Sequence, residues 1–179
     1  MAAMPNDPNW RLPDVPTFLL SSPDFAAGGA LPTSARSAIM GAGGDDRSPA
    51  LNWEGAPSGT RSYAVTVYDP DAPTGSGFWH WAVYNVPAHV TSLAGNAGDP
   101  DASLLPPGAL TLPNEARMPR YVGAAPPPGN GEHRYFFTVT ALDVPSLSLD
   151  PESTPAVLGF NFLGHILARA QLMGTTETP

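Results

Sequence analysis

Apolar residues fall into short runs separated by turn-forming residues, which is the pattern typical of β-strands. The strongest strand prediction covers 62–68, where the residues are almost all β-branched, aromatic or small and apolar (Ser-Tyr-Ala-Val-Thr-Val-Tyr). Further strands are predicted at 17–20, 48–53, 78–86 and 133–142. Many strands followed by one helix predict a mainly β protein: an antiparallel β-sandwich with a C-terminal helix packed at one end.

One helix is predicted near the end of the chain. Thr154 suits the N-cap position and Pro155 the first helical position. The helix is expected to run through 156–173 and to end at Gly174, a residue suited to the position after a helix. Because nearly every residue in 157–167 is apolar, we expect this helix to be substantially buried.

The remaining segments predict loops. Prolines in residues 1–14 favour an extended N-terminal arm, and the three glycines in 40–48 favour a mobile loop. Residues 94–120 are expected to form a long irregular connection, in which Asn114 could either shape a turn or contact the rim of a site. Neither an internal repeat nor a linker is evident, so 1–179 is expected to be a single domain.

Composition narrows the function classes. The chain has 23 prolines and 18 glycines, only 13% charged residues and a net charge of −8. That charge argues against nucleic acids and anionic membranes as partners, since both require a basic surface. The absence of cysteine excludes disulfides and thiolate metal sites. We expect no membrane insertion, because no apolar stretch approaches the length of a span, and a cytoplasmic location.

Candidate chemistry gathers at the ends of three predicted strands. Asp69 follows the strand at 62–68, and strict alternation places Phe78 and His80 on one face of the next strand. His133 and Tyr135 share a face of a later strand. A carboxylate beside two histidines leaves three possibilities open: a divalent metal, acid–base catalysis, or an anion held by imidazole and backbone N–H groups.

Several motifs carry a resemblance to a known family. They are Asp69-Pro70-Asp71-Ala72-Pro73, Phe78-Trp79-His80-Trp81, and Tyr121-Val122-Gly123-Ala124-Ala125-Pro126-Pro127-Pro128-Gly129 with His133-Arg134-Tyr135. Together they closely resemble the phosphatidylethanolamine-binding proteins, which include the Raf kinase inhibitor protein and the plant flowering regulators. The segments Thr74-Gly75-Ser76-Gly77, 48–53 and 159–162 are similar to the bacterial branch. The resemblance covers roughly residues 17–173.

The resemblance implies a β-sandwich with a small anion-binding cavity near one end. In relatives that cavity takes phosphate, acetate or a phosphoethanolamine-like head group. By motif position, its lining here would be Asp69, Phe78, His80, Ala125, Pro126, His133 and Tyr135. Ala125 departs from the more usual glycine and is expected to narrow the cavity. The family also often has a cis peptide in the acidic motif, which makes Ala72–Pro73 a candidate.

Neighbouring residues have structural interpretations. Asp71 and Arg134 are expected to form an ion pair that supports the two motif loops, because buried charges pair. Trp79 and Trp81 are expected in the core. His165 is expected to be a core or interface residue of the predicted helix, with an approach to the cavity as the alternative.

The resemblance favours a non-enzymatic protein that binds a small anion, without cofactor or metal. Regulation or inhibition of a kinase or protease, and a homodimer, are further expectations from the family. The alternative is a hydrolase, lyase or isomerase that uses Asp69, His80 and His133 for acid–base chemistry. The chain has no cysteine and no Gly-x-Ser-x-Gly motif, which makes the enzyme the less favoured interpretation.

Overall fold

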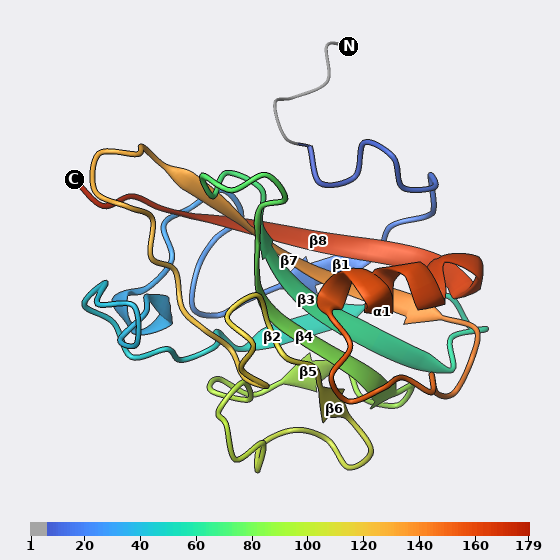
Figure 1. Ribbon diagram of the computed structural model, residues 1–179. Helices are drawn as coiled ribbons and strands as arrows, with labels where there is room; N and C mark the ends of the chain where they lie inside the picture. The colour runs from blue at the N-terminus through green and yellow to red at the C-terminus, as the bar shows by residue number, and fades with distance from the viewer. Residues whose placement is uncertain (1–6) are drawn as a thin grey trace.

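A computed structural model describes residues 7–179 and shows two antiparallel sheets packed face to face (Figure 1). The smaller sheet has the spatial order β1 (Leu19–Ser21), β2 (Leu51–Glu54), β5 (Ser92–Leu93). The larger sheet has the order β6 (Leu110–Thr111), β4 (Phe78–Pro87), β3 (Ser62–Asp69), β7 (His133–Leu142), β8 (Ile166–Thr176). The helical elements are η1 (Thr33–Ala35), α1 (Pro155–Phe162) and η2 (Leu163–His165). The predicted mainly β fold, with antiparallel sheets and a C-terminal helix, is therefore confirmed.

The main core lies between the two sheets. Alternate residues of the long strands point into it, and Val65, Val67, Phe137 and Val139 have no exposed surface. Trp53 of the smaller sheet lies on the same core, where its ring meets that of Tyr63 edge-on at 5.4 Å. Each fully buried side chain of this kind contributes about 1.5–3 kcal/mol of transfer free energy. This core holds the strand ends at fixed positions.

Helix α1 packs on the outer face of the larger sheet, and Figure 1 shows it across β3 and β7. The predicted start is confirmed, since the Thr154 hydroxyl accepts a hydrogen bond from the backbone N–H of Val157, with Pro155 as the first helical residue. The predicted length is wrong, because α1 ends at Phe162. Only Pro155 and Leu158 of α1 are buried, so the predicted burial of most of the helix is wrong. Leu158 lies against Ala64, Ala82 and other residues of the outer face.

The rest of the predicted helix is the edge strand β8. Ten register pairs join β8 to β7, from His133↔Thr176 to Leu142↔Ile166. The sequence Ala168-Arg169-Ala170-Gln171-Leu172 alternates between small or apolar inward positions and polar outward positions. Alanine, leucine and glutamine favour helices intrinsically, but pairing along the whole length of β7 overrides that preference.

A β-bulge in β4 changes the faces that strict alternation predicts. Val67 pairs with Trp81 and Tyr68 with Trp79, so His80 is an extra residue in the β4 strand. Trp81 is therefore fully buried in the core as predicted. Trp79 is half-buried on the outer face, where its ring lies 4.4 Å from that of Tyr68, so the prediction of a core position for Trp79 is wrong.

Other predicted features differ in detail. The described part of the N-terminal arm, residues 7–14, contains turns, while residues 1–6 lie outside the described part of the chain. No peptide bond of the described residues is cis, so the prediction for Ala72–Pro73 is wrong. His165 is not a core residue: its side chain is 41% exposed and its Nδ1 lies 2.8 Å from Asp143 Oδ1. Among residues 7–179, no helix is long and apolar enough to cross a membrane.

Candidate functional site

The predicted site residues meet at one end of the larger sheet. Asp69 is the last residue of β3, Phe78 the first of β4 and His133 the first of β7. Neighbouring strands are antiparallel, so these three positions lie side by side. Asp69 is the direct register partner of Phe78. The topology thus places the carboxylate, the aromatic ring and the imidazole in one place.

Asp69 and His133 form a buried pair with exposed fractions of 3% and 2%. The carboxylate Oδ2 lies 2.8 Å from His133 Nδ1, and Oδ1 accepts hydrogen bonds from the backbone N–H groups of Asp71 and Ala72. The other ring nitrogen, Nε2, lies 2.8 Å from the side-chain oxygen of Asn130. Both ring nitrogens of His133 are therefore occupied, and the histidine is fixed between a carboxylate and an amide.

His80 is held by the backbone of the segment opposite. Its Nδ1 lies 2.7 Å from the carbonyl oxygen of Val122, and the Val122 N–H donates to the His80 carbonyl in return. Burial lowers the pKa of His80, while the hydrogen bond to Val122 and the charge of Asp69 act in the opposite direction. The histidine is therefore neutral near pH 7, with its proton on Nδ1 and a lone pair on Nε2.

Two aromatic rings flank the imidazole of His80. The His80 ring lies 4.8 Å from that of Phe78 and meets the ring of Tyr135 edge-on at 5.2 Å. Tyr135 is 1% exposed, and its hydroxyl makes no hydrogen bond to any of residues 7–179. Burial raises the pKa of Tyr135 well above its usual range, and Asp69 adds to this effect. The backbone N–H of Ala125 lowers the pKa of Tyr135, although its geometry relative to the Tyr135 hydroxyl falls short of a hydrogen bond.

The loop that carries Ala125 and Pro126 closes this end of the sandwich. Pro126 is buried, and Ala125 is half-buried. The loop is anchored through Ala124, whose N–H donates to the Ala35 carbonyl and whose own carbonyl accepts from Ser37 N–H. The predicted site residues from three strands and this loop therefore lie together.

A second buried carboxylate, Asp46, anchors the same loop. One oxygen accepts from the Gly123 N–H and the Ser37 hydroxyl, and the other accepts from the Ala38 and Ile39 N–H groups. Burial alone would raise the pKa of Asp46, but these hydrogen bonds together lower it below its usual value. The predicted mobile loop at 40–48 is thus tied to the site at Asp46, and that prediction is wrong there.

The predicted ion pair between Asp71 and Arg134 is confirmed. Arg134 Nε donates to Asp71 Oδ2 and Nη2 donates to Oδ1, both at 2.7 Å. The same carboxylate accepts from the backbone N–H of Arg134. Burial would raise the pKa of Asp71, but the hydrogen bonds from Arg134 lower it. The pair joins the acidic loop to the start of β7 and so fixes both sides of the site.

Three residues of this arrangement could not be assigned to the site from the sequence: Val122, Asn130 and Asp46. Val122 acts through its carbonyl, which any residue would supply. Asn130 lies between two glycines and indicates only a turn. Asp46 follows a glycine-rich run. Its one unusual sign, a left-handed backbone at φ 52°, is visible only in the structure. Asn114, by contrast, shapes a turn, bonding to the backbones of Met118 and Arg120.

Comparison with known proteins identifies the family. The family model described as phosphatidylethanolamine-binding protein matches residues 21–177. The chain belongs to the phosphatidylethanolamine-binding protein family. The UPF0098 protein YbcL of Escherichia coli K12 is a member at 43% identity over 160 residues, which cover 89% of this chain and 87% of YbcL. The crystal structure of YbcL superposes with a TM-score of 0.88 at 41% identity, covering 90% of this chain and 99% of that one.

Two more distant matches differ in what they show. A lipoprotein named LppC from Mycobacterium tuberculosis H37Rv is 31% identical over 165 residues, which cover 92% of this chain and 75% of LppC. The fold also matches a carboxypeptidase Y inhibitor, solved in complex with its cognate proteinase, with a TM-score of 0.54 at 19% identity. That match covers 92% of this chain and 85% of the other. The cytoplasmic location of the present chain stays a prediction.

Proposed function

We propose that this protein is a non-enzymatic binding protein that takes a small anionic group at the buried end of the sandwich. Phosphate and phosphoethanolamine-like head groups are the favoured ligands. The observation that carries the proposal is the Tyr135 hydroxyl, which is buried and lacks a hydrogen-bond partner among the described residues. A buried hydroxyl without a partner costs about 1–3 kcal/mol, and a ligand oxygen would remove that cost.

The donors and acceptors around this hydroxyl favour a particular ligand chemistry. Tyr135 O–H and the N–H of Ala125 would donate to an anionic oxygen. Neutral His80 presents a lone pair at Nε2, because its Nδ1 proton is directed to Val122. Hydrogen phosphate, or a phosphomonoester that binds as its monoanion, can donate its own P–OH to that lone pair. Acetate at neutral pH has no such proton, so the site favours phosphate over acetate.

Asp69 and His133 would fix the geometry of the site, because their hydrogen bonds go to other protein groups rather than to the ligand. Asp69 is saturated by two backbone N–H groups and His133, and the far nitrogen of His133 bonds to Asn130. Donation from His133 to an anion would require the exposed Asn130 side chain to move away. Phe78 and Pro126 would supply the walls.

Calorimetry with sodium phosphate and O-phosphoethanolamine tests this proposal on the wild type and two matched variants. Tyr135→Phe removes the free hydroxyl and is expected to weaken binding by about tenfold or more. Tyr84→Phe removes a hydroxyl from a tyrosine buried in the other core cluster, under α1, and should leave the affinity unchanged. Equal heats for all three proteins would contradict the proposed site. Release of inorganic phosphate from phosphoethanolamine that disappears in His80→Ala would favour the hydrolase instead.

Regulation of a kinase or protease is the second part of this proposal. It is supported by the carboxypeptidase Y inhibitor, which has the same fold and was solved with the proteinase that it inhibits. The homodimer expected from the sequence likewise stays a prediction.

A further inference from the structure

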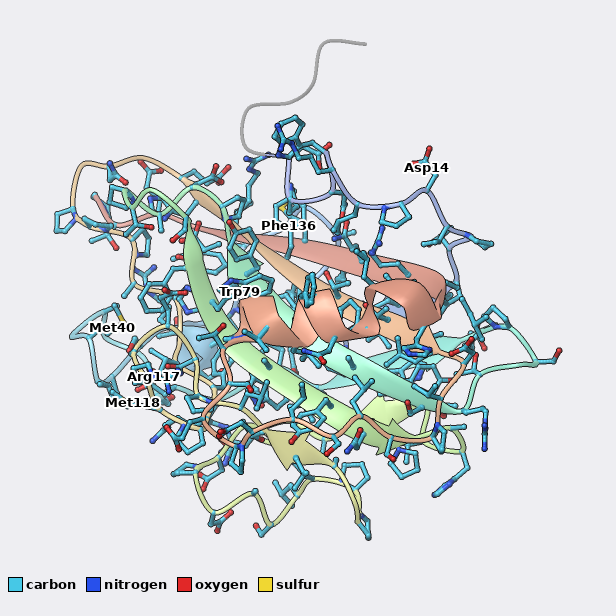
Figure 2. The ribbon with its side chains drawn as sticks, turned by 45° about the vertical axis from the view of Figure 1, so that its right-hand side comes forward. Asp14, Met40, Trp79, Arg117, Met118 and Phe136 are labelled. Carbon is cyan, nitrogen blue, oxygen red and sulfur yellow. The ribbon has the colours of Figure 1, made fainter. Side chains whose placement is uncertain are left out.

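A groove of about 580 Å³ lies on the outer face of the larger sheet, away from the proposed anion site. Its floor is formed by β3, β4, β7 and β8, and its walls by α1, the N-terminal arm and the loop at 70–77. Trp79 and Phe136 lie beside α1 on this face (Figure 2). The site residues Phe78, His80 and Tyr135 are not among its lining. The volume is typical of pockets for small organic molecules, which span roughly 300–1,000 Å³.

One end of the groove is aromatic. The rings of Tyr68 and Trp79 lie 4.4 Å apart, and Phe136 lines the floor of the groove with them. Phe160 of α1 and Trp10 of the arm line the groove with 80% and 65% of their surface exposed. Large aromatic side chains with this much exposure mark surfaces that bind apolar groups. Flat aromatic ligands are suited to such surfaces, because their rings can stack or meet edge-on.

Polar groups without partners line the other part of the floor. Within the described chain, the hydroxyls of Thr66 and Thr140 make no hydrogen bonds. Arg169 also lines the groove: its Nη1 is 3.5 Å from the Pro13 carbonyl, and its buried Nη2 has no partner among residues 7–179. Burial lowers the pKa of Arg169, and Asp14 opposes this shift. A buried guanidinium nitrogen without a hydrogen-bond partner is stabilised by a charge-assisted hydrogen bond to an anionic oxygen.

We propose that the groove binds a planar aromatic molecule that carries a carboxylate or sulfonate. The aromatic body lies on Trp79, Tyr68 and Phe136, and the anionic group is directed towards Thr140 and Arg169. The Nη2 atom is shielded from solvent, so the anion reaches it as the arm shifts over β8. Two side-chain hydrogen bonds between Asn9 and Gln171 attach the arm there. This proposal is independent of the anion site.

A pair of glycines provides a matched test. Gly159 of α1 lines the groove, and a Cβ added there meets no atom within 4 Å. Gly164 has equally open surroundings but does not line the groove. Gly159→Phe should therefore fill the groove without strain, while Gly164→Phe adds the same ring elsewhere. Thermal midpoints and phosphate calorimetry of both variants verify that the fold and the anion site are retained.

The probe is 1-anilinonaphthalene-8-sulfonate, titrated by fluorescence against the full chain. We expect a Kd on the order of 10 μM for the wild type and for Gly164→Phe. Gly159→Phe should weaken binding by about tenfold or more. Equal binding to all three proteins, or no binding to the wild type, would overturn the proposal.

The uncharged analogue N-phenyl-1-naphthylamine tests the role of Arg169. Arg169→Gln should weaken binding of the sulfonate several-fold and leave binding of the uncharged analogue unchanged. This variant also keeps the proposal testable should Gly159→Phe fail to fold. If the two probes lose affinity equally in Arg169→Gln, the anionic part of the ligand assignment is wrong. Competition of either probe by an arbitrary extended peptide would indicate a peptide groove and would also overturn the small-molecule assignment.

Discussion

At the scale of the residue, His80 determines the character of the proposed site. As the extra residue of the β4 bulge it turns inward together with Trp81. Its Nδ1 proton is directed to Val122, so Nε2 is left as an acceptor. Two titratable groups face it: Asp69 favours the imidazolium, and His133 disfavours it. Burial outweighs the attraction of Asp69, and the free protein therefore holds His80 neutral near pH 7.

Binding of phosphate should therefore take up protons. The negative charge of the bound phosphate favours a proton between its oxygen and His80 Nε2, whether that proton stays on the P–OH or moves to the imidazole, so affinity should rise as the pH falls from about 8 to about 6. Calorimetry in two buffers with different ionisation enthalpies measures this uptake, which should approach about one proton per site. In His80→Gln the number of protons taken up should fall towards the number that the ionisation of phosphate alone contributes. Zero uptake or proton release in the wild type would show that no proton is gained at His80 and would contradict the predicted rise of affinity at lower pH.

At the scale of the element, the site depends on segments that connect strands. The segment 121–125 supplies the Val122 carbonyl and the Ala125 N–H, and Asp46 holds it from the preceding loop through Gly123. The carboxylate of Asp46 thus joins segment 121–125 to the loop at 40–48.

Asp46→Asn tests this joint. The asparagine side chain has one oxygen that accepts hydrogen bonds, whereas both oxygens of Asp46 do so. The substitution therefore leaves buried N–H groups unpaired and should lower the free energy of unfolding by about 1–3 kcal/mol. It should also weaken phosphate binding, because Ala125 loses its support. Asp45→Asn is the matched control, since Asp45 is exposed and its side chain makes no hydrogen bond among the described residues. Urea unfolding compares the two variants, and equal stability would show that Asp46 is not the anchor.

At the scale of the whole molecule, buried titratable groups link stability to pH. The pKa of His80 is lower in the folded protein than in the unfolded chain. The unfolded chain therefore binds a proton at His80 more readily, and stability falls below about pH 6.5. The pKa values of Asp46 and Asp71 are also lowered, so their contributions are present above about pH 4 and are lost as the pH falls below it. Stability is therefore expected to fall in two stages on acidification.

Thermal midpoints between pH 8 and pH 3 measure these stages. The wild type should lose stability below about pH 6.5 and lose more below about pH 4. His80→Gln should diminish the first loss, and Asp46→Asn should diminish the second. A wild type and a His80→Gln variant that respond identically between pH 7 and pH 5 would show that His80 does not contribute to the first stage.

The sequence by itself predicted five of the eight strands of residues 7–179, the start of the helix, the Asp71–Arg134 pair and the position of the candidate site residues near strand ends. These features depend on local patterns: apolar runs, a capping threonine, and functional residues at the ends of strands. Only the tertiary structure decided that β8 is a strand, because its partner β7 lies apart in the sequence. It also decided which way Trp79 points, since a bulge depends on the register between two strands. The contacts of Asp46 and Asn130 were likewise decided there. Asp46 accepts from backbone N–H groups, which leave no trace in residue identity, and Asn130 meets the side chain of His133 only through the conformation of the turn between them.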